Sequence, residues 1–461
     1  MILNDFKQNL NTFIEHINNW QQSFPEYSAD DCLKVDKNHL TSVSQNFLNK
    51  LENNYPFHHP LYAGQMLKSP HPIAIMGYIA AMMINPNNHS LDGGPATAEM
   101  EKEIIKLFAN TFGFQTYLGH LTTSGTIANL EALWISRELH PDKYIAFSDQ
   151  AHYTHGRVCK LLNTRYIELK STPYGKLDLQ NLEKAVDKYD IGTLVVTLGT
   201  TSLGALDELD KILTLKNTHG FRIHIDGAYG AYYKIISQYE KNLNKFDLIS
   251  KCDSIAFDPH KLGLQPYGCG SIIFSDPDVG CIYKHDSPYT YFTSKDLHLG
   301  EISLECSRAG AAAAALWLTL QCFSLNYDNG FGPILKKQRQ AAISFARNIS
   351  NSNYFKLYIE PEIDILNYFP IADSTEKITY LTESIFDYCM NKAKSPLYLA
   401  KLKVPAEKFR ILHPEISIDS EYITILRSCL LKPEHSDWVD IIVEILESYF
   451  SEGQKLKNKL Y

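Results

Sequence analysis

Two short apolar runs flank a single turn in the stretch Ser254-Ile-Ala-Phe-Asp-Pro-His-Lys-Leu-Gly-Leu-Gln-Pro-Tyr-Gly-Cys-Gly-Ser-Ile-Ile-Phe274. The runs at 254–257 and 270–274 are typical of buried strands. The turn between them presents Lys261 beside His260. An amine held there can form a Schiff base with an aldehyde, so the turn is a candidate reactive site. The same sequence is also consistent with a lysine exposed in a surface loop, and this stretch alone leaves both interpretations open.

Strand and helix patterns alternate along the chain on the amino-terminal side of this stretch. Strand-like apolar runs occur at 144–148, 193–199 and 221–226, and helical apolar spacing occurs at 98–112, 126–139, 179–188 and 208–218. This alternation predicts an α/β domain with a largely parallel sheet. Ligands of such sheets bind at the carboxyl ends of the strands, so the polar residues after each strand are the first candidates for function.

We expect three regions along the 461 residues. Residues 1–70 combine amphipathic helical spacing with many polar positions, which predicts a helical arm that needs a partner surface. Residues 71–330 hold the alternating pattern and are expected to form the large α/β domain. A turn-rich break at 327–333 leads into residues 331–461, which are expected to form a smaller α+β domain.

Composition argues against several classes of protein. The balance of 44 basic and 52 acidic residues, 44 − 52 = −8, offers no basic surface for nucleic acid or for a membrane. The apolar run at 309–325 is shorter than the roughly 20 residues that span a bilayer, and it predicts a buried helix. Nine cysteines without a C-x-x-C pair favour neither disulfides nor zinc. The first residues lack a secretory signal, so we expect a cytoplasmic protein.

Polar signals follow the expected strands. Ser124, Gly125 and Thr126 open the helix at 126–139, and the amides of a helix N-terminus suit a phosphate group. Asp226 closes a strand, where a carboxylate can hold a ring nitrogen protonated. Simpler explanations exist for both, because serine, threonine and aspartate are also ordinary helix caps.

Two histidines follow the strand at 144–148. His152 can stack on a flat ring, although a loop histidine is more often only a hydrogen-bonding partner. His152 and His155 could also form a metal pair, but no nearby acidic ligand completes it, so no metal is expected. Nucleotide-binding glycine motifs are absent from the sequence. Together, Lys261, Asp226, His152 and the turn at 124–126 predict pyridoxal phosphate as the cofactor.

These motifs resemble those of the group II pyridoxal-phosphate-dependent decarboxylases, the family of aromatic amino-acid, glutamate, histidine and bacterial tyrosine decarboxylases. The resemblance runs from about Pro60 to the C-terminus and is carried by the turn at 124–126, Asp149-Gln-Ala-His152, Thr197-Leu-Gly-Thr-Thr201, Asp207, His224-Ile-Asp226 and Asp258-Pro-His-Lys261. Bacterial tyrosine decarboxylase-like members look nearest, through Asn85-Pro-Asn-Asn88 and Glu305-Cys-Ser-Arg-Ala-Gly310. The resemblance implies fold type I, the aspartate aminotransferase-like fold, with a mostly parallel mixed sheet and a small C-terminal α+β domain.

The resemblance also implies residue roles toward the cofactor. Lys261 would attach the cofactor, Asp226 would pair with its ring nitrogen and His152 would stack on its ring. The other implied cofactor contacts are Ser124, Gly125, Thr126, Thr201, Ala228, His260 and Ser307. The family assigns the return of a proton to the substrate carbon to a tyrosine on a loop, which here is Tyr289 or Tyr291.

The resemblance also implies which residues contact the substrate. Arg427 falls where the family binds the substrate carboxylate, unless it only closes a strand at the surface. Gln65, Asn87 and His89 would also lie near the substrate. The family forms dimers with shared active sites, so Ser307 and the segment 87–89 are expected to reach the site of the partner.

The expected reaction is α-decarboxylation of an L-amino acid to the amine and carbon dioxide. The segment 87–89 is polar where aromatic-selective relatives are apolar, and Lys68 adds a possible cation. We expect an aromatic substrate such as tyrosine, with an acidic or diamino acid (glutamate, aspartate or 2,4-diaminobutyrate) as the alternative. Two further interpretations are a carbon–carbon lyase that uses the same cofactor, and a non-catalytic binding homologue, which need not have kept Lys261.

Overall fold

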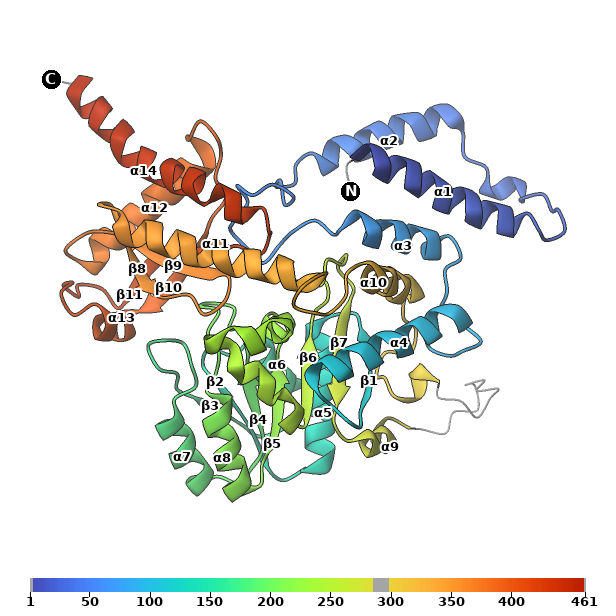
Figure 1. Cartoon of the computed structure of the whole chain (residues 1–461), viewed down its shortest axis with the longest axis horizontal. Helices are drawn as coiled ribbons and strands as arrows, with labels where there is room; N and C mark the ends of the chain where they lie inside the picture. Colours follow the sequence, from blue (N-terminus) through green and yellow to red (C-terminus); the bar gives the residue numbers. More distant parts are fainter. Residues whose placement is uncertain (1–2, 285–297, 460–461) are drawn as a thin grey trace.

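The computed structural model describes residues 3–284 and 298–459. A seven-stranded sheet with the order β1-β7-β6-β5-β4-β2-β3 forms its centre (Figure 1). The strands are β1 (Leu118–Thr122), β2 (Tyr144–Ser148), β3 (Tyr166–Leu169), β4 (Ile191–Thr197), β5 (Arg222–Asp226), β6 (Ser254–Phe257) and β7 (Gly270–Phe274). β7 pairs antiparallel with β6 and β1, and the other neighbours pair parallel. The prediction of a mostly parallel mixed sheet is confirmed.

Helices cover both faces of this sheet. One face packs against α4 (Pro95–Phe112), α7 (Leu179–Lys188) and α8 (Leu209–His219), and the other packs against α5 (Gly125–Leu139) and α6 (Thr154–Leu161). Strand side chains alternate between the two layers, so Leu194 and Val196 of β4 belong to the first core and Val195 to the second. Burying each such side chain contributes about 1.5–3 kcal/mol.

Strand direction brings the candidate residues to one edge of the sheet. β2, β4, β5 and β6 run the same way, and β1 joins them because two antiparallel steps restore the direction. β7 begins at this edge, where Gly270 pairs with Thr122. A Cβ on Gly270 would lie 2.5 Å from the carbonyl carbon of Ser124, so glycine is required where β7 passes the start of α5.

A second, smaller sheet lies in the C-terminal region. It is antiparallel, with the order β10-β11-β9-β8, and consists of β8 (Phe355–Ile359), β9 (Ile365–Pro370), β10 (Ala400–Pro405) and β11 (Tyr422–Cys429). α11 (Phe331–Asn351), α12 (Thr375–Asn391) and α14 (His435–Lys459) pack on one face. The other face meets α13 (Ala406–Leu412), together with Leu203 and Ala205 from the loop after β4. The prediction of a small C-terminal α+β unit is confirmed.

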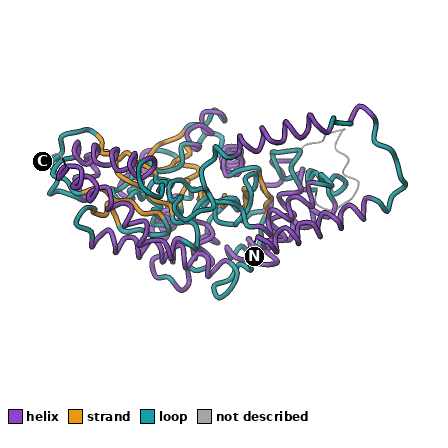
Figure 2. Tube along the Cα trace, turned by 90° about the horizontal axis from the view of Figure 1, so that it is seen from above, coloured by secondary structure: helices purple, strands orange, loops and turns teal. Residues whose placement is uncertain are grey.

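The N-terminal helices α1 (Leu3–Gln21) and α2 (Lys37–Leu51) extend beyond the rest of the chain at one end of the molecule (Figures 1 and 2). α1 contacts α3 (Pro72–Met82), which in turn packs against α10 (Gly310–Cys322). α10 is largely buried, which confirms the buried helix predicted within 309–325. Among the described helices, none is long and apolar enough to cross a membrane.

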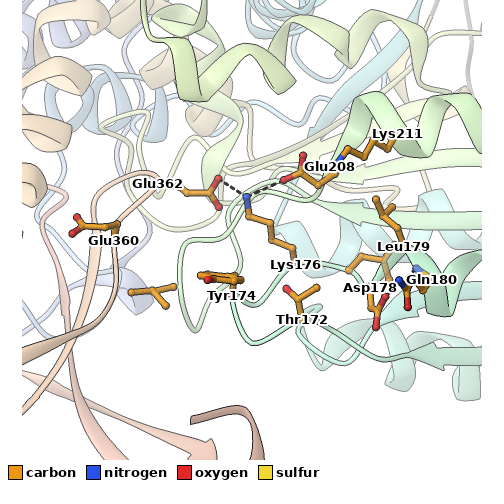
Figure 3. A pocket seen from close by; sticks show the side chains of 12 residues that line it. Thr172, Tyr174, Lys176, Asp178, Leu179, Gln180, Glu208, Lys211, Glu360 and Glu362 are labelled. Carbon is orange, nitrogen blue, oxygen red and sulfur yellow. Dashed lines mark hydrogen bonds and ion pairs between the residues drawn. The ribbon is translucent and has the colours of Figure 1, made fainter. Parts of the chain in front are cut away.

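A charged brace joins the two sheets beside a cavity of about 650 Å³ (Figure 3). Lys176 Nζ lies 3.0 Å from Glu208 Oε1 at the start of α8 and 2.8 Å from Glu362 Oε1 between β8 and β9. Burial opposes the charge of Lys176, but contacts with Glu362 and Glu208 outweigh burial and raise its pKa above the usual range. None of the residues that line this cavity is among the predicted site residues, and we assign it a structural role.

Replacing Lys176 by methionine should lower the free energy of unfolding by about 1–3 kcal/mol, because two partly buried carboxylates lose a shared cation. Urea unfolding followed by circular dichroism measures the change. Lys356→Met is the matched control, since Lys356 and its partner Glu415 are 47% and 50% exposed and should contribute little. Equal stability of the two variants would contradict the role of the brace.

Candidate active site

A cavity of about 260 Å³ lies at the edge of the sheet where the parallel strands end. The turns after β1, β2, β4, β5 and β6 all contribute to its wall. The predicted residues that line it are Ser124, Gly125, Thr126, His152, Thr201, Asp226, Ala228, His260 and Lys261. The structure therefore brings together residues that are up to 137 positions apart in the sequence, from Ser124 to Lys261.

Lys261 faces an aspartate that the sequence motifs contain but that was not among the predicted site residues. Its Nζ lies 3.1 Å from Asp258 Oδ2, and Asp258 is 3% exposed. His260 Nε2 lies 3.5 Å from the same oxygen, while its Nδ1 hydrogen-bonds the carbonyl of Cys269 at 2.8 Å. Burial lowers the pKa of His260 despite the nearby carboxylate, which favours a neutral ring. Asp258 thus places a carboxylate directly opposite the amine of Lys261.

Asp226 is a buried carboxylate held by two donors. Its Oδ1 accepts a hydrogen bond from the amide of Ala228 at 3.1 Å, and its Oδ2 lies 2.8 Å from Nε2 of His155. Burial alone would raise the pKa of Asp226. The hydrogen bond and charge of His155, together with the charge of Lys261, outweigh burial and hold that pKa well below its usual range. Asp226 is therefore ionised and can pair with a cationic group in the cavity.

His152 forms part of the cavity wall. Its Nδ1 lies 2.6 Å from Thr154 Oγ1, which fixes the orientation of the ring. Burial lowers the pKa of His152, although Asp226 opposes this, so the neutral ring is favoured. The ring of Tyr153 lies 4.2 Å from that of His152, centroid to centroid. A neutral, oriented imidazole on the wall suits stacking on a flat ligand.

The start of α5 forms the anion-binding part of the cavity. Ser124 caps the helix by accepting a hydrogen bond from the amide of Ile127 at 3.4 Å. The amides of Gly125 and Thr126 open the helix and have no carbonyl one turn earlier, so they are available to an anion. A Cβ on Gly125 would lie 2.6 Å from Asp258 Oδ2, so a side chain here would displace that carboxylate.

Arg427 lies behind the wall that Thr201 forms. Its Nη1 donates to the carbonyl of Thr201 at 2.8 Å, and its Nη2 donates to Oε1 of Gln65. Arg427 is 6% exposed, so the alternative of a surface arginine is wrong. The structure thus brings Gln65 and Arg427 together next to Thr201, although neither side chain lines the cavity itself.

Other predicted residues lie elsewhere. Asn87 Nδ2 donates to Ser307 Oγ at 3.2 Å, and Asn87 Oδ1 accepts from the amide of His89 at 3.2 Å. These three residues form a cluster of their own, and none of them lines the cavity around Lys261. Their roles in a shared site stay predictions. Tyr289 and Tyr291 lie outside the described residues.

A buried polar network supports that cluster. Glu101 accepts hydrogen bonds from Nδ2 of Asn88 at 2.6 Å and from the amide of Leu121 at 2.8 Å. Nη1 of Arg308 pairs with the same carboxylate. Because Leu121 belongs to β1, the network ties the segments around Asn88 and Arg308 to the strand that leads into the start of α5. The sequence offered no signal for this network beyond the motif letters at 85–88 and 305–310.

The residues present fit pyridoxal phosphate. The cavity offers an amine for an aldehyde, a carboxylate for a ring nitrogen, a flat neutral ring for stacking and helix amides for a phosphate. Two buried oxygens of lining residues, Thr197 Oγ1 and Asp258 Oδ1, have no hydrogen-bond partner among the described residues, which leaves hydrogen-bonding capacity at this site. Such a constellation on this fold defines a pyridoxal-phosphate enzyme of fold type I.

Comparison with known proteins identifies the family. The family model of the pyridoxal-dependent decarboxylase conserved domain matches residues 25–368. The chain belongs to this family of pyridoxal-phosphate-dependent carboxy-lyases, which act on amino acids. The resemblance stated from the sequence motifs is confirmed.

Individual relatives differ in substrate. L-tyrosine decarboxylase of Enterococcus faecium is 26% identical, and the match covers 83% of this chain and 82% of that protein. L-aspartate decarboxylase of Thermococcus kodakarensis is also 26% identical, over 66% of this chain and 78% of that protein.

Solved structures share the fold at lower identity. The crystal structure of mouse CSAD superposes with a TM-score of 0.77 at 18% identity, covering 97% of this chain and 91% of that chain. The crystal structure of Oryza sativa TDC with PLP and tryptamine gives a TM-score of 0.76 at 14% identity, with coverages of 97% and 99%. These likenesses confirm fold type I.

Proposed function

We propose that this decarboxylase acts on an aromatic L-amino acid with a polar ring substituent, such as tyrosine, and that Lys261 attaches its cofactor. The observation that carries the proposal is the meeting of Lys261, the ionised Asp226 and the start of α5 around one cavity. L-tyrosine decarboxylases are among the relatives at 26% and 24% identity.

When bound, pyridoxal phosphate supplies an aldehyde carbon that holds the substrate amine and a ring that accepts the electron pair left by carbon dioxide. Asp226 holds a proton at the ring nitrogen and so stabilises the developing charge. His152 orients the ring by stacking, and the amides of Gly125 and Thr126 bind the phosphate. Arg427 orients the substrate carboxylate. Tyr289 or Tyr291 donates the proton that takes the place of carbon dioxide on the α-carbon of the substrate.

A second candidate substrate is an acidic amino acid. L-aspartate decarboxylase of Thermococcus kodakarensis matches this chain at 26% identity. Near Gln65, Nζ of Lys68 is buried without a hydrogen-bond partner among the described residues. Burial lowers the pKa of Lys68 to about 8, although Asp364 and Glu434 oppose this, so the side chain remains largely cationic at neutral pH. A cation in this region would attract a substrate with a second carboxylate.

A substrate panel separates the two candidates. The purified protein, loaded with pyridoxal phosphate, is given tyrosine, tryptophan, aspartate, glutamate or 2,4-diaminobutyrate, and carbon dioxide and amine are measured. Highest kcat/KM on tyrosine supports the proposal, and highest kcat/KM on aspartate or glutamate replaces it with the second candidate. Bound cofactor without carbon dioxide release from any of them would overturn both.

We further propose that the protein works as a homodimer. Leu40, Val43, Phe47 and Leu51 repeat at helical spacing along α2 and are between 49% and 59% exposed in the single chain. A stripe of this kind requires a partner surface. The separate cluster of Asn87, His89 and Ser307 is also what a site shared between two copies would need.

Two charges on the stripe should dissociate the dimer. The double variant Val43→Glu/Phe47→Glu is expected to give the monomer mass in light scattering coupled to gel filtration, because burying two carboxylates in an apolar contact is costly. The control is Gln45→Glu/Asn49→Glu, which has the same spacing on the face where Gln45 and Asn49 hydrogen-bond each other. A stripe variant with the mass of the wild type would exclude α2 from the interface.

A further inference from the structure

We propose that His155 is a positioning residue that fixes the orientation and the ionised state of Asp226, and through Asp226 governs how tightly the cofactor is held. This inference rests on the role of Asp226 in the proposed function. His155 belongs to α6 and is 0% exposed. Its Nε2 lies 2.8 Å from Asp226 Oδ2, across a separation of 71 residues.

The carboxylate of Asp226 is held at both oxygens. The amide of Ala228 donates to Oδ1 at 3.1 Å, and His155 binds Oδ2. The amide lies only two residues after Asp226 in the chain, so it fixes one oxygen relative to the neighbouring backbone alone. His155 comes from a different element, so it fixes the rotation of the carboxylate relative to the sheet. Asp226 lines the cavity, and these two donors fix the orientation of its carboxylate there.

The contacts of His155 indicate which of its two ring nitrogens is the hydrogen-bond donor. A nitrogen that pairs with an ionised carboxylate must carry a proton, so Nε2 is the donor. Nδ1 of His155 is buried and has no hydrogen-bond partner within the described part of the chain. The ring packs on Phe147, with centroids 5.9 Å apart. Among the described residues, Asp226 is therefore the hydrogen-bond partner of the His155 ring, and each of the two groups fixes the orientation of the other.

Several charged or titratable groups surround Asp226. His155 faces it from α6, His152 from the turn before α6, Lys261 from the turn after β6 and His224 from β5 itself. Burial raises the pKa of Asp226, whereas His155 and Lys261 lower it. When the hydrogen bond from His155 is removed, less interaction opposes the effect of burial, so the pKa of Asp226 rises. An anion with a lowered pKa is effective above that pKa and is lost as the pH falls through it.

Asparagine and glutamine at position 155 test the hydrogen bond rather than the packing. The amide nitrogen of glutamine takes the place of Nε2 and can reach Asp226, whereas that of asparagine takes the place of Nδ1 and cannot. The readouts are the dissociation constant of pyridoxal phosphate, obtained by titrating the apoenzyme and following the visible absorption band, and the pH at which acidification releases the cofactor.

His155→Asn should raise the dissociation constant about ten- to a hundredfold, the cost of losing a hydrogen bond to a charged group. Its release on acidification should occur about one pH unit or more above that of the wild type. His155→Gln should stay close to the wild type in both readouts. The control is His120→Asn, which removes a second buried histidine whose Nε2 lies 2.9 Å from a carboxylate oxygen, Oε2 of Glu131, and neither residue lines the cavity. It should leave both readouts unchanged.

Folded Asn and Gln variants that match the wild type, or that are impaired to the same degree, would overturn the inference. If the asparagine variant does not fold, the glutamine variant decides: near-wild-type binding supports the role, and lost binding contradicts it. Failure of the proposed function is distinguishable, because the wild type would then bind the cofactor without decarboxylating any amino acid, or would not bind it at all.

Discussion

Lys261→Ala is expected to lower kcat by roughly a thousandfold, within the range produced by removing a positioned catalytic group. Lys261 is the amine on the cavity wall, 3.1 Å from Asp258, and no other lysine lines this cavity among the described residues. Alanine leaves the pocket intact but removes the group that attaches the cofactor. The purified variant should therefore lose the visible absorption band of the attached cofactor after gel filtration, while the wild type keeps it.

The matched control for this variant is Lys216→Ala. The side chains of Lys216 and Lys261 are both 23% exposed, and each pairs with an aspartate, Lys216 with Asp253 at 2.6 Å. Lys216 lies on α8, outside the cavity, so its loss should affect neither the band nor the rate. A Lys261→Ala protein that retains the band would refute the assignment of the attachment site.

Asp226→Asn is expected to lower kcat about a hundredfold or more, because the electrostatic stabilisation of developing charge is usually the largest catalytic contribution. An amide carries no charge and cannot stabilise a protonated ring nitrogen. Asparagine can still accept the amide hydrogen of Ala228, so the fold should persist. Measured kcat on the best substrate, with circular dichroism to confirm folding, checks the expectation.

Asp207→Asn separates this effect from the loss of any buried carboxylate. Asp207 is 1% exposed and accepts hydrogen bonds from the amides of Leu177 at 2.7 Å and Thr197 at 2.8 Å. Burial raises its pKa to about 6 despite these bonds. The variant should lose about 1–3 kcal/mol of unfolding free energy and keep kcat. If Asp226→Asn and Asp207→Asn reduce kcat equally, Asp226 has no special role.

Strands with strong local patterns were predictable from the sequence. β2, β6 and β7 occupy the predicted residues, because each is a short apolar run bounded by polar or turn residues. β1 and β3 were not predicted. β1 contains Gly119 and His120, and β3 is only four residues long with Glu168 exposed, so neither shows the apolar run of a central strand. Pairing with β7 and β2, which is not local, makes them strands.

Site residues on strand-end turns were predictable for the same reason, since strand direction gathers those turns at one edge. His155 and Asp258 were not predicted as site residues. The importance of His155 depends on its contact with Asp226, which is 71 residues away in the chain. A single sequence does not show that two such distant residues are in contact. Asp258 is close to Lys261 in the sequence, but the proline and histidine between them gave no reason to expect the carboxylate to face the lysine.

The start of α5 shows how this site can tolerate change. Its phosphate contacts are proposed to come from main-chain amides, and such donors are present whatever side chain a residue carries. Mutation can therefore alter much of the surrounding sequence without removing them. The restriction falls on space: Gly125 meets Asp258, and Gly270 meets the backbone of Ser124. At these two positions any added carbon atom must displace something, so they leave evolution less freedom than the amides that bind the ligand.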